Sequence, residues 1–417
     1  MRVLLLSWEH PPVVVGGLGK HVQELAKALA ALGHEVAVLS RGPMGATASQ
    51  CPRPETTQDG VRVVLVPEDP LSLEFGSDLV AWTLSLGHAM LRAGLSLAET
   101  FQPDVLHAHD WLVAAPAIAL AEHLDIPLIT TVHATEAGRH DGWIGNAVSA
   151  QVHSAEHWLV RSSDALICCS ESMRRETSAL FGITGAAEEP SVIPNGIDLS
   201  AWPFTPPDRC AAVPKLLFVG RLEYEKGVHD LIESLPLIRE AHPGTTLSVV
   251  GAGTQERWLR EVARDHKVAS AVRFFGNLDH VGIRRHMRSS SVMVVPSRYE
   301  PFGLVALEGA AAGIPLVVAD TGGLGEAVAE NRTGWSFPPG DVPALAEAVS
   351  RSLASPTRSA RRAKAARERI SSEFDWLRVA ERTAEVYRNA KRQSDRQPIP
   401  RPSLHLPVRL LPRGPQP

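Results

Sequence analysis

Short, continuously apolar segments alternate with amphipathic segments along most of the chain. Runs of Val, Leu and Ile bounded by polar or Gly residues are typical of strands buried on both faces of a parallel sheet. Segments with apolar residues at helical spacing lie between most of these runs, and a Pro-containing connector at residues 203–208 separates two such series. The pattern predicts strands at residues 3–6, 35–40, 61–66, 105–109, 128–133, 165–169 and 191–193, then at 215–220, 246–251, 272–276, 292–295 and 315–319.

This alternation predicts an α/β fold with two doubly wound Rossmann-like domains that face each other across a cleft. We expect an N-terminal domain over residues 1–198, a C-terminal domain over 199–372, and a helix over 373–392 that crosses back to the first domain. Residues 393–417 are rich in Pro and Arg without helical periodicity, which predicts a disordered tail. Ligands of such folds bind beyond the carboxyl ends of the strands, so the site is expected in the cleft.

Composition narrows the class of protein. With 44% apolar and 21% charged residues the chain is typical of a globular protein, and its net charge of -4 argues against a nucleic-acid partner. The four cysteines form neither a zinc pattern nor a disulfide framework, which favours a reducing, cytoplasmic location. The apolar run near the N-terminus is too short for a signal peptide or a membrane span. The sequence leaves peripheral membrane association and homo-oligomerisation open.

One stretch, residues 297–308, has the pattern of an anion site. It follows a predicted buried strand, contains Pro and Gly, and enters a helix that is expected to stop at Gly313. The first N–H groups of a helix lack partners within the helix and lie at its positive end, so they bind phosphate. Glu300 and Glu308 flank this point, and their carboxylates suit sugar and ribose hydroxyls. The alternative is an ordinary strand-to-helix junction with solvated glutamates.

Two cations follow the first strand of the second series. Arg221 and Lys226 lie at its carboxyl end, between glycines that let the backbone bend. Such a pair neutralises a diphosphate leaving group as the bond to it breaks. The alternative is a solvated loop in which the two cations pair with Glu223 and Glu225.

A Gly-rich loop, residues 16–19, precedes the first predicted helix and is a second candidate anion site. Its order, Gly-Gly-Leu-Gly, differs from the Gly-x-Gly-x-x-Gly fingerprint of dinucleotide-binding folds. Ser40 and Arg41 stand after the second strand, where that fingerprint expects an acid. Both differences argue against a nicotinamide cofactor.

His107, His109, Asp110 and His133 lie at the ends of two predicted strands. Three interpretations stay open: a metal site, core histidines with backbone partners, or polar contacts with a substrate in the cleft. No Asp-x-Asp occurs in the chain, so a Mg²⁺ or Mn²⁺ bridge to a diphosphate lacks its usual carboxylates. We therefore predict a site without a metal.

Several motifs occur together in a fixed order and spacing. They are Gly16–Gly19, His109-Asp110-Trp111, Asn195–Asp198, Gly220–Gly227, Glu300–Glu308 and Thr321–Leu324. In this order they resemble the retaining glycosyltransferases of family 4, which have the GT-B fold and are related to bacterial glycogen synthases. The resemblance covers roughly residues 1–391.

Three segments, at residues 7–9, 133–140 and 221–230, are similar to the actinobacterial α-(1→4)-glucosyltransferases of methylglucose lipopolysaccharide and glycogen synthesis. The resemblance implies transfer of α-glucose from UDP- or ADP-glucose to the 4-hydroxyl of an α-glucan or methylglucose oligosaccharide. It implies no cofactor, with the nucleotide sugar as co-substrate. The alternatives are mannosyl or N-acetylglucosaminyl transfer to a lipid or glycoside by the same family, a same-fold epimerase or phosphorylase, and a non-catalytic nucleotide-sugar binding module.

The resemblance also implies roles for residues of the C-terminal domain. Arg221 and Lys226 would hold the donor diphosphate and stabilise it as it leaves. Glu300 would face the sugar hydroxyls, and Glu308 would bind the ribose hydroxyls. The backbone amides expected to contact phosphate are those of Gly303, Leu304 and Val305.

In the N-terminal domain, Gly16 and Gly17 would contact phosphate from the opposite side of the cleft. His133 resembles the histidine beside the anomeric carbon, and Asp110 would lie toward the acceptor. Val14 stands where starch and glycogen synthases carry a lysine, so one phosphate contact of those enzymes is missing here.

Overall fold

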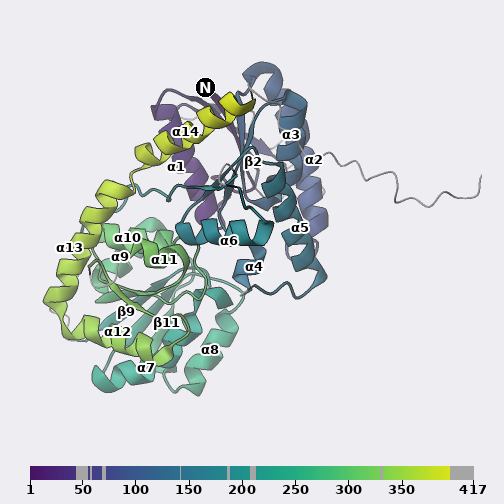
Figure 1. The fold of residues 1–417 in the computed structure, drawn as a ribbon. Coiled ribbons are helices and arrows are strands. Elements are labelled where there is room, and N and C mark those ends of the chain that lie inside the picture. Colours follow the sequence, from purple (N-terminus) through teal and green to yellow (C-terminus); the bar gives the residue numbers. More distant parts are fainter. Residues whose placement is uncertain are drawn as a thin grey trace, which may run out of the picture.

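The computed structural model describes residues 1–43, 55–56, 59–67, 72–140, 142–185, 188–206, 213–328 and 332–394. These residues form two α/β domains, one above the other in Figure 1. The predicted disordered tail lies, from residue 395 onward, outside the described residues, as do Cys51 and Cys210.

The first domain contains an eight-stranded sheet in the order β3-β4-β2-β1-β5-β6-β7-β8. All neighbouring strands are parallel except β3 and β4. The strands are β1 (Arg2–Ser7), β2 (Glu35–Arg41), β3 (Glu55–Thr56), β4 (Val61–Val66), β5 (Val105–His109), β6 (Leu128–Val132), β7 (Ala165–Cys168) and β8 (Ser191–Val192).

The second domain contains a six-stranded parallel sheet in the order β11-β10-β9-β12-β13-β14. Its strands are β9 (Lys215–Val219), β10 (Thr246–Val250), β11 (Val272–Phe274), β12 (Val292–Val295), β13 (Leu316–Ala319) and β14 (Trp335–Phe337). The two doubly wound domains confirm the fold expected from the alternating pattern. The prediction missed β3 and β14, because edge strands of two or three residues are too short to give a periodic signal.

Helices cover both faces of the first sheet. On one face, Leu4 and Leu6 of β1 pack against α2 (Leu79–Phe101), α3 (Ala114–Leu124) and α5 (Ala147–Ser162). On the other face, Val3 and Leu5 pack against α1 (Gly17–Ala31) and α14 (Trp376–Ser394). Successive side chains of a strand point to opposite faces, so the apolar residues 3–6 of β1 supply both cores.

The second sheet is built in the same way. Leu216 and Phe218 of β9 pack against α7 (Val228–Ala241), α8 (Glu256–Asp265) and α12 (Val342–Ala354). Leu217 and Val219 face the core that includes α9 (His280–Ser289), α10 (Leu304–Ala312) and α13 (Pro356–Glu373). No helix of the described ranges is both long and apolar enough to cross a membrane.

The chain returns to the first domain at its C-terminal end. Helix α13 lies along the second domain, and α14 continues upward beside α1 (Figure 1). Tyr387 of α14 is fully buried, and its hydroxyl lies 2.7 Å from Nδ1 of His107 in β5. Lys391 pairs with Asp104 at 2.7 Å. The last helix is therefore part of the first domain's core.

Candidate active site

A cavity of about 550 Å³ lies between the two domains. Residues after β1, β5 and β6 line it from the first domain, and residues after β9 and β12 line it from the second. The carboxyl ends of both sheets therefore meet there, as the fold predicts. All the residues to which the resemblance assigns a role line this cavity, except Glu308. Of the three predicted histidines, His133 lines it, and His107 and His109 do not.

Lys226 and Glu300 form an ion pair in the cavity wall. The Lys226 Nζ lies 2.9 Å from Glu300 Oε2, and the two side chains are 16% and 13% exposed. Ser297 Oγ donates a second hydrogen bond to the same carboxylate oxygen at 3.1 Å. The Glu300 backbone is held as well, because its carbonyl accepts a hydrogen bond from Gly323 N at 3.1 Å. This carboxylate is therefore fixed at the entrance to α10.

A tight turn positions Lys226. It ends a short 3₁₀ helix, Tyr224–Lys226, and Gly227 follows with φ of 63°. A Cβ at Gly227 would clash with the carbonyl oxygen of Pro296, which precedes the Glu300 loop. Only glycine combines a positive φ with this close approach. The turn thus brings Lys226 against the loop that carries Glu300.

Arg221 lies at the carboxyl end of β9 and is more exposed than Lys226. Its side chain is 45% exposed, and Nη2 lies 3.0 Å from Glu225 Oε1. Glu223 instead accepts hydrogen bonds from Thr254. The alternative of a self-paired loop therefore holds for Arg221 and Glu225, whereas Lys226 pairs across to Glu300.

The N-terminus of α10 points into the cavity. Gly303 caps the helix with φ of 94°, and Ala306 N donates the first hydrogen bond, to the Gly303 carbonyl, at 2.9 Å. The amides of Leu304 and Val305 precede that bond, and both residues line the cavity. Such amides at the positive end of a helix are donors for an anion.

Glu308 lies one turn into α10 and contacts the opposite domain. Its Oε1 is 2.7 Å from Nζ of Lys20 in α1, and the side chains are 13% and 27% exposed. Sequence reasoning missed Lys20, although it directly follows the Gly-rich loop. The predicted ribose contact of Glu308 remains a prediction.

The Gly-rich loop is organised by an acid that the sequence did not single out. Oε2 of Glu9 accepts hydrogen bonds from the amides of Val15 and Gly16, each at 2.8 Å. Gly17 faces the other domain, where a Cβ would lie 2.7 Å from Leu304 Cδ1. Glu9 follows β1 at its carboxyl end, and that position was the available signal. The two predicted anion sites thus meet across the cleft.

Asp110 turns sharply out of β5, with φ of 62°. A positive φ is uncommon for residues other than glycine and marks a position that its surroundings constrain. Oδ1 of Asp110 accepts a hydrogen bond from His133 N at 2.7 Å. Burial raises the pKa of the Asp110 carboxyl to about 6, and the hydrogen bond from His133 opposes that rise. The carboxylate and the histidine therefore share one corner of the cavity.

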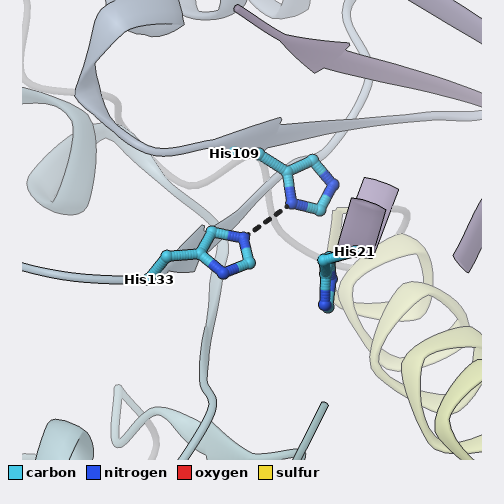
Figure 2. Close-up of side chains that lie close together, drawn as sticks. All are labelled: His21, His109 and His133. Carbon is cyan, nitrogen blue, oxygen red and sulfur yellow. Dashed lines mark hydrogen bonds between the residues drawn. The ribbon is translucent and has the colours of Figure 1, made fainter. Parts of the chain in front are cut away.

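The predicted histidines converge, and a fourth joins them. Nδ1 of His109 lies 3.1 Å from Nε2 of His133, and His21 of α1 lies beside both rings (Figure 2). Burial lowers the pKa of His133 to about 4 and holds those of His21 and His109 well below the usual value. All three imidazoles are therefore neutral at neutral pH. Sequence reasoning missed His21 because a helix, rather than a strand end, supplies it.

An aromatic stack lines the first-domain side of the cavity. The rings of Trp8 and Phe75 are parallel, with centroids 5.2 Å apart, and Trp82 packs edge-on against both. Phe75 remains 40% exposed. No periodic pattern along the chain indicates this stack, because its members come from a strand end, a loop and a helix.

Hydrogen bonds join the domains beside the cavity. The Tyr299 hydroxyl donates to Glu176 Oε1 at 2.9 Å and accepts from Thr135 N at 3.2 Å. Ser170 Oγ, at the N-terminus of α6 (Glu171–Phe181), donates to the Pro301 carbonyl at 2.8 Å. The loop between β12 and α10 is therefore held against the first domain.

Two family models match the chain. Residues 15–201 match "Glycosyltransferase Family 4", and residues 212–369 match "Glycosyl transferases group 1". A glycogen synthase of Mycobacterium tuberculosis is 55% identical over 406 residues, which is 96% of this chain and 97% of that protein. The chain belongs to glycosyltransferase family 4.

Two further proteins are similar to this family 4 glycosyltransferase. An alpha-maltose-1-phosphate synthase of Mycobacterium tuberculosis is 31% identical over 422 residues, covering 93% of this chain and 99% of that protein. The structure of a sucrose-phosphate synthase from Thermosynechococcus elongatus matches with a TM-score of 0.79 and 25% identity, covering 93% of this chain and 98% of that one. The family and the GT-B fold that the motifs resembled are thereby confirmed.

Proposed function

We propose that this glycosyltransferase moves α-glucose from UDP- or ADP-glucose to the 4-hydroxyl of an α-(1→4)-glucan, with retention of the anomeric configuration. Its 55% identity to a glycogen synthase, over nearly the whole of both chains, carries the proposal. The products would be glycogen, methylglucose lipopolysaccharide, or both. The reaction would need neither a metal nor a cofactor.

The donor diphosphate would lie between Lys226, Arg221 and the N-terminus of α10. Lys226 has three ammonium protons, and its contact with Glu300 uses one of them. The others can bond phosphate oxygens as negative charge develops on the leaving group. Cations and helix amides that are already in place stabilise such charge without reorganising. Diphosphate departure would therefore be assisted from the second domain.

The transferred glucose would lie between Glu300 and His133. Glu300 is held by Lys226 and Ser297, so its carboxylate can accept hydrogen bonds from sugar hydroxyls at a fixed place. His133 is neutral and lines the same cavity. A neutral imidazole beside the anomeric carbon adds no positive charge that would oppose an oxocarbenium-like transition state.

The acceptor would enter from the first domain, past Asp110 and the exposed ring of Phe75. An aromatic ring gives an apolar surface on which the C–H face of a sugar can pack, while Asp110 supplies a hydroxyl contact. The interdomain bonds of Tyr299 and Ser170 keep the cleft walls together. Water, which would hydrolyse the donor, is then excluded from the reacting centre.

A direct assay tests the proposal. The purified chain is incubated with radiolabelled UDP-glucose or ADP-glucose and maltooligosaccharide, and products are separated by length. We expect elongated oligosaccharides whose new linkage has an α-anomeric proton signal and is cleaved by α-amylase. Absence of transfer from either donor to a glucan or methylglucose acceptor would overturn the proposal.

The same assay separates the alternatives. The similarity to an alpha-maltose-1-phosphate synthase favours glucose 1-phosphate as a second acceptor to include. Mannosyl or N-acetylglucosaminyl transfer would require the corresponding donor. An epimerase would change the sugar without transferring it, a phosphorylase would release glucose 1-phosphate from glucan, and a binding module would leave the donor intact.

A further inference from the structure

Three histidines from three separate elements form a compact cluster at the wall of the cleft. His21 lies on α1, His109 ends β5, and His133 follows β6. One nitrogen from each ring lies within 4.8 Å of a nitrogen of each other ring, and Figure 2 shows the three side chains close together. His21 is 5% and His109 0% exposed.

Hydrogen bonds orient two of these rings and leave nitrogens without partners. Nδ1 of His21 lies 2.8 Å from Asn195 Oδ1 and donates to it, so the lone pair of this ring is on Nε2. Nε2 of His21 and Nε2 of His109 are both buried and have no hydrogen-bond partner. A buried polar atom without a partner costs free energy, and such atoms are rare unless a ligand completes them.

His107, which lies beside the cluster, differs from His21 and His109 because both of its ring nitrogens have partners. His107 is also fully buried, and its ring lies 4.2 Å from that of His109. Its Nδ1 lies 2.7 Å from the Tyr387 hydroxyl, and its Nε2 lies 2.7 Å from Thr131 Oγ1. Both of its nitrogens are therefore satisfied by the fold. Among these four neighbouring histidines, only His21 and His109 of the three-histidine cluster keep a buried nitrogen without a partner.

We propose that His21, His109 and His133 form a binding site for a borderline divalent cation, represented by Zn²⁺, and that its occupancy inhibits transfer. The site consists of three imidazoles, which suit Zn²⁺, Cu²⁺ or Ni²⁺ rather than Mg²⁺ or Ca²⁺. Three protein ligands leave a fourth position for water or a sugar oxygen from the cavity.

The spacing of the His109 and His133 nitrogens fits this ion, whereas the full set of three lies within 4.8 Å. Two nitrogens at about 2.0–2.1 Å from one tetrahedral Zn²⁺ are about 3.4 Å apart. Nδ1 of His109 and Nε2 of His133, the nitrogens that would bind the ion, already lie 3.1 Å apart. The unpartnered Nε2 of His109 would then keep its proton and would not be a ligand, so Nε2 of His21 is the unpartnered nitrogen that the ion would complete. The hydrogen bond between Asn195 and His21 is the kind of outer contact that orients a metal-bound imidazole. Each neutral ring supplies one lone pair and keeps its other N–H, so binding releases no proton.

Inhibition, unlike binding, rests on the proposed function. His133 lines the cavity where the glucose is placed, so a cation on it would put positive charge beside the anomeric centre. That charge opposes an oxocarbenium-like transition state. The metal site thus shares His133 with the proposed reaction, which needs no metal.

Titration of the metal-stripped full chain with ZnCl₂ tests binding. Isothermal titration calorimetry should give one site per chain, and His21→Gln should weaken it at least about 10-fold. His266→Gln, an exposed histidine of the second domain, is the matched control and should bind as the unaltered chain does. Equal binding by His21→Gln, or the absence of a stoichiometric site, would overturn the proposal.

A second measurement does not depend on how well a variant folds. CoCl₂ added to the unaltered chain should give the intense visible bands of a four-coordinate Co²⁺ site, which ZnCl₂ should abolish. Only the weak bands of six-coordinate Co²⁺ would also overturn the proposal.

Initial rates of glucosyl transfer complete the test. ZnCl₂ should inhibit the unaltered chain and His266→Gln, and His21→Gln should need at least about 10-fold more Zn²⁺ for the same inhibition. Stoichiometric zinc binding without any effect on transfer would overturn the inhibitory role. Stoichiometric binding by a chain that transfers no sugar would support the site and count against the proposed function alone.

Discussion

Lys20 and Glu308 are 288 residues apart in the chain and form a 2.7 Å ion pair across the cleft. The ion pair joins the N-terminal turn of α1 in the first domain to α10 in the second domain, the helix expected to bind the donor. It places Glu308, the predicted ribose ligand, in contact with the opposite domain, so the interdomain ion pair and the proposed donor contact would share one carboxylate.

Glu308→Gln should raise the KM for the nucleotide sugar about 10-fold and change kcat by less than about 3-fold. A hydrogen bond from a hydroxyl to a carboxylate contributes about 1.5–3 kcal/mol, and the proposed ribose contact would be the same in the ground state and the transition state. Steady-state kinetics with varied donor check this. Lys20→Met is the control, since it breaks the ion pair and keeps the carboxylate. An equal rise in KM for Lys20→Met would assign the effect to interdomain pairing.

Lys226→Ala and Glu300→Ala should each lower kcat by about 100-fold to 1,000-fold, because each removes a group that we propose to contact charge or hydroxyls of the transition state. Circular dichroism should show the fold intact, and turnover is measured with saturating donor and acceptor. Arg257→Ala, whose side chain is 93% exposed in a surface ion pair, is the control and should leave turnover unchanged. Near wild-type turnover in both site variants would refute the assignment.

Glu156 should make the protein less stable as pH rises. Burial raises the pKa of this carboxyl to about 8, whereas the unfolded chain has the usual value near 4.5. Between these two pKa values the Glu156 carboxyl is protonated in the folded state and ionised in the unfolded state. The stabilisation from Glu156 is therefore complete below the pKa of the unfolded chain, and it is lost as pH rises through the pKa of the folded chain. Urea unfolding at about pH 5.5 and about pH 9 should show a loss on the order of a few kcal/mol.

Glu156→Gln should remove most of that loss, since its amide oxygen can still accept the hydrogen bond that Glu156 Oε1 receives from Glu136 N at 2.7 Å. Glu240→Gln, an exposed glutamate on α7, should retain the full pH dependence. An unchanged pH dependence in Glu156→Gln would locate the titrating group elsewhere.

Chelation should not reduce transfer. Treatment with EDTA should leave the initial rate unchanged, or raise it where trace zinc was bound, because in the proposed reaction Lys226, Arg221 and helix amides supply the positive charge. Added MgCl₂ should give no further increase. Full loss of activity in EDTA, restored by Mg²⁺ or Mn²⁺, would contradict a metal-independent reaction.

Much of the architecture could be predicted from the chain alone. Apolar runs such as residues 3–6 and 292–295 place strands because a buried parallel strand needs both faces apolar, and Gly313 ends its helix at the expected position with φ of 86°. Arg221, Lys226 and Glu300 could be assigned to one cavity because carboxyl ends of parallel strands share an edge. Local pattern and topology suffice for such inferences.

Other relationships depend on distances between segments that no local pattern encodes. Tertiary packing decided that Lys226 pairs with Glu300 rather than with Glu223 or Glu225. It also brought Lys20 to Glu308 and added His21 to the histidine cluster. Periodicity specifies which face of a helix or strand is buried, but the identity of the opposing side chain depends on how two domains and α14 close together. The sequence by itself determined the two α/β domains and which strand ends meet at the cleft, and only the folded chain decided which charges and imidazoles touch.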